Sequence, residues 1–325
     1  MTQYDVFNGD ADGLCALQQL RLSQPQDSIL ITGVKRDIEL LNALTAQVGD
    51  QVTVLDISLD KNRQAVLRLL AAGASIEYFD HHFAGEIPQH ERLTVHIDTQ
   101  AQVCSSLLVN HHLQGQYLAW AVVGAFGDNL FEAARQAALP LNYSEAELKQ
   151  LEQLGTYLNY NGYGESLADL HYRPDDLFRQ LQPYREPLLF IQQADAFARL
   201  QEGYQQDMAQ AQQLEPIQQT TGSAVFILPN AAWARRCSGV LANQLARQMP
   251  NRAHALLTEQ GGGSYLVSVR APKANPMGAD DLCRAFPTGG GRKAAAGINQ
   301  LPAERYADFV QQFQQIYPAL SGDCN

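Results

Sequence analysis

The chain has 325 residues, of which 46% are hydrophobic and 18% are charged, and its formal net charge is −11. This length predicts two domains, and the acidic balance argues against a protein that grips long duplex nucleic acid, because such proteins usually neutralise phosphates with a basic surface. No apolar run approaches the about 18 residues of a membrane span and no signal peptide is evident, so we expect a cytoplasmic protein without membrane attachment.

The first half of the chain alternates short β-rich runs with helical patterns, for example at 11–22 and 61–72. The β-rich runs are 4–7, 28–32, 51–55, 75–79 and 93–97. This alternation predicts an α/β fold with a doubly wound, mainly parallel sheet. Ligands bind beyond the carboxyl ends of the strands in such sheets, so polar residues that follow these runs are candidates for a functional site.

The first predicted strand is followed by the turn 8–13, with the sequence Asn-Gly-Asp-Ala-Asp-Gly. Asp10 and Asp12 lie two positions apart and can each bind a metal ion, and the flanking glycines let the backbone approach a ligand closely. The same pattern is also typical of a turn that caps a helix. From the turn alone, both interpretations stay open.

Two further carboxylates end apolar runs. Asp56 finishes the run 52–55, where a carboxylate must be paired or bound to metal because its desolvation is costly. An alternative role is a helix cap, although Asp60 is better placed for that. Asp128 follows the apolar run 122–127, and it too is open to interpretation as a helix cap.

The triplet Asp80-His81-His82 ends the fourth predicted strand. Two imidazoles and a carboxylate are typical metal ligands, and the other carboxylates at strand ends strengthen that interpretation. The pair His111-His112 lies in a helical run with no acidic residue nearby in the sequence. We therefore expect no site at that pair.

The second half is helical to about residue 219 and then returns to an α/β pattern. Residues 187–213 are predicted to form one long helix that connects the domains, and we place the catalytic domain at 1–185, a helical linker at 186–220 and a smaller domain at 221–325. The five cysteines form no CxxC pair and predict reduced thiols instead of disulfides or a zinc site. They are Cys15, Cys104, Cys237, Cys283 and Cys324.

The order and spacing of these motifs over residues 3–130 resemble the DHH phosphoesterase superfamily, which includes single-strand nucleases and nano-RNA and phospho-adenosine phosphatases. The resemblance implies a hydrolase with two manganese ions, for which magnesium or cobalt are possible replacements. It implies that Asp10 and Asp56 hold one ion and that a second set, with Asp56 as the bridge, holds the other. This second set is Asp12, Asp56, His81 and Asp128.

The resemblance also divides the catalytic roles within the triplet. His81 is expected to bind metal, His82 to lie beside the substrate phosphate, and Asp80 to orient a histidine. Asn8 departs from the family pattern, in which Asp or His is usual. Asn8 is still a candidate metal ligand through its amide oxygen, but this oxygen carries no charge, so we expect the ion at Asp10 to bind more weakly than its partner.

The region from about residue 223 resembles the DHH-associated substrate-binding domain. The matching pieces are the strand end at Arg270 and a glycine run that we expect to form a phosphate-cradling loop. Arg292 and Lys293 stand where the family usually has a histidine and are expected to bind the anionic substrate. The glycines of the run are Gly289, Gly290 and Gly291.

These features predict a phosphoesterase that hydrolyses phosphodiester or phosphomonoester bonds of nucleotides or short single-stranded oligonucleotides by a two-metal mechanism. A homodimer is compatible with this prediction. One alternative is a pyrophosphatase or exopolyphosphatase, whose substrate carries no base. A second alternative is a non-catalytic nucleotide-binding regulatory protein. The substitution at Asn8 favours this last alternative, whereas the intact acidic and histidine positions oppose it.

Overall fold

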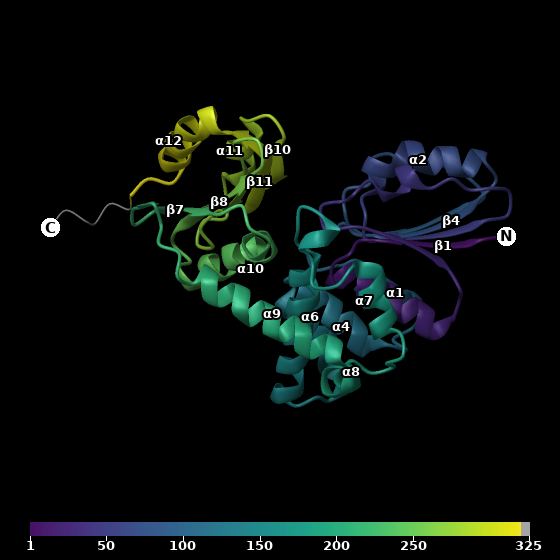
Figure 1. Cartoon of the computed structure of the whole chain (residues 1–325). Coiled ribbons are helices and arrows are strands. Elements are labelled where there is room, and N and C mark those ends of the chain that lie inside the picture. Colours follow the sequence, from purple (N-terminus) through teal and green to yellow (C-terminus); the bar gives the residue numbers. More distant parts are fainter. Residues whose placement is uncertain (320–325) are drawn as a thin grey trace. The chain divides into compact units, whose positions relative to one another are not determined.

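The computed structural model describes residues 1–319, and the chain divides into two compact units, Met1–Gly203 and Tyr204–Asn325 (Figure 1). The boundaries at 185 and 220 stay a prediction. The segment between them contains helices α8 (Pro187–Gln193) and α9 (Asp195–Ala211) and strand β6 (Gln218–Gln219). Cys324 lies outside the described residues. The other cysteines, Cys15, Cys104, Cys237 and Cys283, are free and buried.

The predicted parallel sheet of the first unit is confirmed. Its strand order is β2-β1-β3-β4-β5, and every neighbouring pair is parallel. The strands are β1 Gln3–Phe7, β2 Ile29–Thr32, β3 Gln51–Leu55, β4 Ser75–Asp80 and β5 Leu93–Ile97. Because all five are parallel, their carboxyl ends share one edge of the sheet.

Helices cover both faces of this sheet, as the doubly wound pattern predicts. Helix α2 (Leu59–Ala71) packs Val66, Leu69 and Leu70 into a hydrophobic core with the sheet residues Val54 and Tyr78. Helix α1 (Ala11–Ser23) lies on the opposite side, and it is buried almost throughout because α3 and α4 pack around it (Figure 1).

The remaining helices of the first unit follow the sheet. They are α3 Ser105–His112, α4 Leu118–Gly127, α5 Phe131–Ala138, α6 Glu145–Gly162 and α7 Pro174–Leu181. The prediction of one helix over 187–213 is wrong, because the backbone of Ala194 is extended (φ −90°, ψ 124°) and separates α8 from α9. Short 3-10 turns occupy Leu40–Ala43, Leu139–Leu141, Leu167–Asp169 and Ala303–Arg305.

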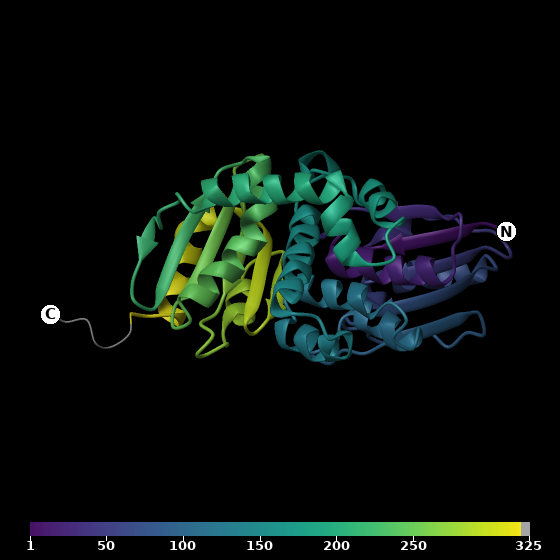
Figure 2. The ribbon, with the colours of Figure 1, turned by 90° about the horizontal axis from the view of Figure 1, so that it is seen from below.

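The second unit has a mixed sheet of order β10-β11-β9-β8-β7-β6, whose strands run side by side in green to yellow in Figure 2. Only the β7–β8 pair is parallel among these described strands. Helices α11 and α12 share the main hydrophobic core with this sheet, and α10 contacts β8 and β9. The elements are β7 Ser223–Leu228, α10 Ala232–Gln248, β8 Ala253–Gln260, β9 Ser264–Arg270, α11 Ala279–Arg284, β10 Gly289–Arg292, β11 Ala295–Pro302 and α12 Tyr306–Ile316.

The glycine run that we expected to form a loop is strand β10. Packing explains two of its glycines. A Cβ at Gly289 would lie 1.8 Å from the carbonyl oxygen of Cys283, and a Cβ at Gly291 would lie 2.5 Å from the Cα of Ala296. These glycines let β10 lie close to α11 and β11, a requirement that the residue pattern alone does not distinguish from a phosphate loop.

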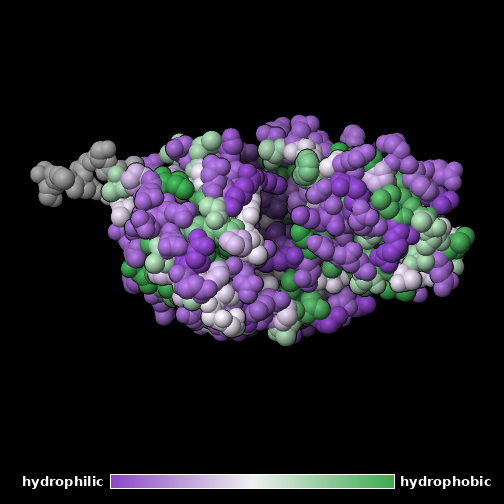
Figure 3. All heavy atoms as spheres, turned by 90° about the horizontal axis from the view of Figure 1, so that it is seen from above, coloured by the Kyte–Doolittle hydropathy of each residue, from purple (hydrophilic) through white to green (hydrophobic). Residues whose placement is uncertain are grey.

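Across the described part of the chain, no helix combines the length and the apolar character needed to span a bilayer. On the face drawn in Figure 3, hydrophilic residues predominate and hydrophobic residues occur in small scattered groups.

Candidate metal centre

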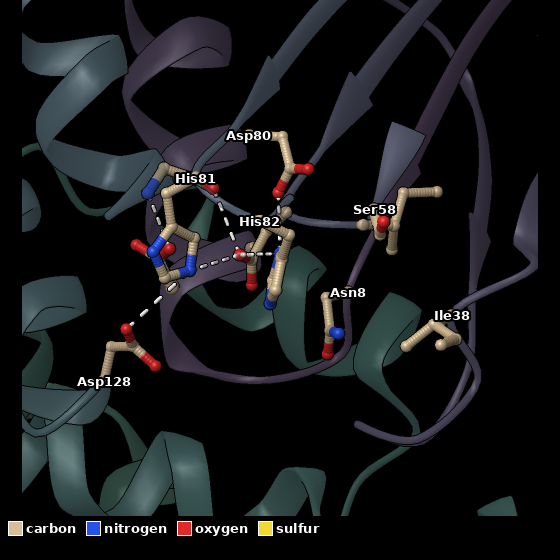
Figure 4. Close-up of polar contacts among 12 residues, drawn as sticks. Asn8, Ile38, Ser58, Asp80, His81, His82 and Asp128 are labelled. Carbon is tan, nitrogen blue, oxygen red and sulfur yellow. Dashed lines mark hydrogen bonds and ion pairs between the residues drawn. The ribbon is translucent and has the colours of Figure 1, made fainter. Parts of the chain in front are cut away.

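Polar side chains from three neighbouring strand ends meet at the carboxyl edge of the first sheet (Figure 4). Asp10 follows β1, Asp56 follows β3, and His81 follows β4. The backbone keeps these ends in register, because the Asn8 N–H donates to the Leu55 carbonyl (3.1 Å) and the Asp56 N–H donates to the Phe79 carbonyl (3.0 Å). These residues therefore lie at the carboxyl edge of the sheet, where the sequence pattern predicted them.

Asp56 is the most constrained residue of the cluster. Its φ of +61° is left-handed, a conformation that costs free energy for any residue with a side chain and is often retained at functional sites. The carboxylate is buried and accepts a hydrogen bond from the Ser105 hydroxyl (3.1 Å). Burial, followed by the negative charges of Asp12 and Asp10, raises the pKa of Asp56 well above its usual value. A bound cation would relieve this concentration of negative charge.

His81 lies between two carboxylates. Its Nε2 is 3.5 Å from Asp56 Oδ1 and 3.8 Å from Asp128 Oδ2. Burial lowers the pKa of His81, but the hydrogen bond and charge of Asp56, with the charges of Asp12 and Asp128, outweigh it and raise the pKa to about 10. A divalent ion can take the place of this imidazolium proton, since metal binding requires the neutral ring.

His82 completes a group with metal-binding geometry. The nearest ligand atoms of Asp56, His81 and His82 all lie within 4.8 Å of one another. Oxygen and imidazole donors in this arrangement fit a divalent ion such as manganese, magnesium or cobalt. The predicted ligands Asp56 and His81 thus come together, with Asp128 beside them.

Asp80 forms a hydrogen bond with His82 and not with His81. Its Oδ1 lies 2.7 Å from His82 Nδ1, while its Oδ2 is buried without a hydrogen-bond partner among the described residues. A carboxylate at Nδ1 holds the proton there and leaves Nε2 of His82 available to a ligand.

Asp10 and Asp12 both cap helices in addition to facing the centre. Oδ1 of Asp10 accepts the N–H groups of Asp12 (3.0 Å) and Gly13 (3.2 Å) at the start of α1. The Asp12 carboxylate accepts the N–H groups of Ser105 (2.7 Å) and Ser106 (2.8 Å) at the start of α3. The helix-capping interpretation of the acidic turn is therefore confirmed for Asp10. Each oxygen of Asp12 keeps a second lone pair for a ligand, whereas Oδ1 of Asp10 already accepts two N–H groups.

The most important residue that sequence reasoning missed is Lys35. Its Nζ forms an ion pair with Asp10 Oδ2 and donates to Asn159 Oδ1 (2.8 Å). Burial lowers the pKa of Lys35, but the charge of Asp10, then those of Tyr163 and Asp128, raise it well above the usual value. Lys35 lies three residues beyond β2. The residues that follow predicted strands were considered only for acidic and histidine side chains, and basic side chains at these positions would have included Lys35.

Asn8 lies at the same edge (Figure 4). Its Nδ2 donates to the Lys35 carbonyl (3.2 Å), and its Oδ1 is buried with no hydrogen-bond partner in the described chain. This oxygen is available as a neutral ligand, but it contributes no charge.

The predicted substrate residues of the second unit lie on and beside the β10–β11 hairpin. Arg270, at the end of β9, donates to Asn243 Oδ1 (2.8 Å), and it pairs with Ala295 of β11. Arg292 and Lys293 are exposed at the turn between β10 and β11. Their role in binding substrate stays a prediction.

We expected no site at His111-His112 because no acidic residue is nearby in the sequence, but in space His112 does have an acidic neighbour. His112, at the end of α3, lies close to Glu77 of β4 and His96 of β5. The sequence pattern does not show that these residues are neighbours, because they come from separate elements that the sheet brings together.

No family model matches the chain, and no curated protein matches it either. Among solved structures, the fold is similar to exonuclease RecJ bound to manganese (TM-score 0.62, 16% identity, covering 97% of this chain and 89% of that chain). It is also similar to PggH, a pGpG-specific phosphodiesterase from Vibrio cholerae (TM-score 0.54, 14% identity, covering 96% of this chain and 97% of that chain). RecJ from Thermus thermophilus in complex with Mn²⁺ matches as well (TM-score 0.56, 17% identity), although the chain spans only 52% of it. These likenesses confirm the predicted fold.

Proposed function

We propose that this chain is a metal-dependent phosphoesterase of the DHH superfamily that acts on nucleotides or short single-stranded oligonucleotides. The observation that carries the proposal is the convergence of Asp56, His81 and His82, with Asp128 beside them, at the carboxyl edge of a parallel sheet. A fold shared with an exonuclease and a pGpG-specific phosphodiesterase supports it.

We assign the metal ligands to Asp56, His81 and Asp128. A divalent ion bound there, which we propose is manganese, would lower the pKa of a water and neutralise charge on the phosphate. The protein's own contribution is to hold these ligands before substrate arrives: the left-handed backbone fixes Asp56, and Ser105 donates to its carboxylate. The second ion implied by the family resemblance would have to compete with the Lys35 ammonium beside Asp10.

We assign His82 to the substrate phosphate. With Nδ1 directed at Asp80, its Nε2 is the nitrogen left for the substrate, and the doubly protonated ring donates from it to a phosphate oxygen or to a leaving oxygen. We further propose that Arg270, Arg292 and Lys293 bind the anionic end of the substrate. A short substrate suits the net charge of −11, which disfavours a long polyanion.

A substrate screen tests the proposal. The chain would be loaded with Mn²⁺, its metal content measured, and product release followed from dinucleotides, phospho-adenosine phosphate, single-stranded DNA and polyphosphate. Release from one of the nucleotide substrates supports the proposal. Release from polyphosphate alone would replace it with the exopolyphosphatase alternative. No release from the loaded protein would favour a binding protein.

Asp80→Asn is expected to reduce turnover by about 10- to 100-fold, because the amide no longer fixes the Nδ1 proton of His82. Steady-state rates on the substrate found in the screen would measure the effect. Binding of the metal should change little, since the Asp80 carboxylate contacts His82 and not His81. Asp98→Asn, just after the neighbouring strand β5, is the matched control. Equal losses in both variants would contradict the orienting role.

A further inference from the structure

We infer that the Lys35 ammonium takes the place of one metal ion, so that this centre works with a single divalent ion. The inference rests on the proposed function and deepens it. It concerns the position beside Asp10, which the family resemblance assigns to a metal.

The contacts of Lys35 are those of a cation that belongs to the centre. Nζ binds the Asp10 carboxylate and Asn159 Oδ1 (2.8 Å), and it lies 5.6 Å from the centre of the Tyr163 ring. The backbone of Lys35 is fixed as well, because its N–H donates to the Gly162 carbonyl (2.8 Å). Three elements, the loop after β2, the turn after β1 and the end of α6, thus converge on one ammonium group.

The ligands left at this position are poor for a second ion. Oδ1 of Asp10 already caps α1, and its Oδ2 holds Lys35. Asn8 offers only a neutral oxygen where a charged or imidazole ligand is usual.

Charge explains why the ammonium and an ion exclude each other. An ion bound to Asp10 would lie within a few ångströms of Nζ, and like charges at that separation in a buried site repel strongly. Lys35 neutralises Asp10, so that one divalent ion offsets most of the negative charge of the remaining carboxylates, Asp12, Asp56 and Asp128. An ammonium at this place can also bind a phosphate oxygen of the substrate, as a metal ion would.

The test counts manganese ions and asks whether they are neighbours. Equilibrium dialysis with elemental analysis would give the stoichiometry, and electron paramagnetic resonance separates an isolated Mn²⁺ from a spin-coupled pair. We expect one isolated ion in the wild type and in Lys35→Arg. Lys35→Met should bind a second ion at least about tenfold more tightly than the wild type does and show spin coupling. Lys61→Met, which removes an exposed lysine of α2, should behave as the wild type.

A spin-coupled pair in the wild type would overturn the inference and leave the phosphoesterase assignment intact. Failure of Lys35→Met to gain an ion would also overturn it. If Lys35→Met does not fold, the stoichiometry of the wild type and of Lys35→Arg decides. One isolated ion without turnover of any substrate would instead count against the proposed function alone.

A different cluster carries a second, independent inference. We propose that Glu77, His96 and His112 bind a transition-metal ion of the zinc type. The nearest ligand atoms of the three side chains lie within 4.8 Å of one another, and His96 Nε2 is 3.0 Å from Glu77 Oε1. Two imidazoles and one carboxylate are a known donor set for zinc with a fourth position open.

The surrounding structure orients this cluster. Phe79 stacks on His96 with 4.3 Å between ring centres and meets His112 edge-on at 5.2 Å. Phe79 and His96 are register partners on neighbouring strands, and Glu77 shares their face because it lies two residues before Phe79. Glu77 and His96 keep 41% and 29% of their side-chain surface exposed, so an ion can enter from solvent.

Cobalt(II) is the probe, because its visible absorption reports coordination number. In an Asp56→Asn background, which weakens the first centre, we expect one Co²⁺ with the spectrum of a low-coordinate site, competed by Zn²⁺. His112→Gln should weaken this binding by about 100-fold, whereas His111→Gln, its exposed neighbour on α3, should not. No such spectrum in the Asp56→Asn background, or equal behaviour of the two glutamine variants, would overturn the proposal.

Discussion

Replacing Asp56 with asparagine is expected to lower the rate of phosphoester hydrolysis by about a thousandfold while the fold stays intact. The Oδ1 of Asp56 lies near both histidines of the centre, 3.5 Å from His81 Nε2 and 4.0 Å from His82 Nδ1. Asparagine tolerates the left-handed backbone at this position, so the loss should come from the missing charge and not from misfolding.

The same variant should melt at the same or a higher temperature in metal-free buffer. Burial and the charges of Asp12 and Asp10 raise the pKa of Asp56, so the ionised carboxylate destabilises the metal-free fold at neutral pH. This opposition between stability and activity is typical of functional residues.

Initial rates at saturating Mn²⁺ and thermal melts in chelator would measure both effects. Asp60→Asn is the matched control, since Asp60 lies nearby on α2 and pairs with Arg63 at a partly exposed site. Full activity in Asp56→Asn would contradict the assignment of the centre. A large fall in the melting temperature would show instead that Asp56 is chiefly structural.

Arg21→Met is expected to destabilise the first unit by about 3–5 kcal/mol. Arg21 of α1 binds the carboxylate of Asp5, in the middle of β1, through two nitrogens, with Nε at 2.7 Å from Oδ2. Both side chains are buried, at 5% and 1% exposure. Removing the arginine leaves a buried carboxylate whose remaining side-chain donor, among the described residues, is the Ser28 hydroxyl, and this costs far more than the pair itself contributes.

Urea unfolding followed by circular dichroism would measure this loss. The double variant Asp5→Leu/Arg21→Met should recover most of it, because it removes the unpaired charge as well. Arg179→Met is the comparison at the surface: Arg179 and its partner Asp176 are exposed, its other partner Asp175 is partly exposed, and we expect a change of at most about 1 kcal/mol. Similar losses for Arg21→Met and Arg179→Met would contradict the prediction.

The sequence by itself determined the parallel sheet of the first unit and the position of its candidate centre. Both follow from local information: β-rich runs separated by helical patterns predict parallel strands, and carboxyl ends of parallel strands share an edge. Asp56 and His81 could therefore be placed near each other without coordinates. The helix-capping role of Asp10 was also among the interpretations that the acidic turn allowed.

Tertiary structure decided the features that depend on partners far away in the chain. Lys35 lies 25 positions from Asp10 and 124 from Asn159, so no local pattern marks it as part of the centre. The same holds for His112, which gains Glu77 only because α3 packs against the sheet. At Gly289, the close approach of Cys283 explains a residue that the sequence pattern suggested for phosphate binding. Periodicity reports which face of an element is buried, but the charge that a site carries depends on which elements the fold brings together.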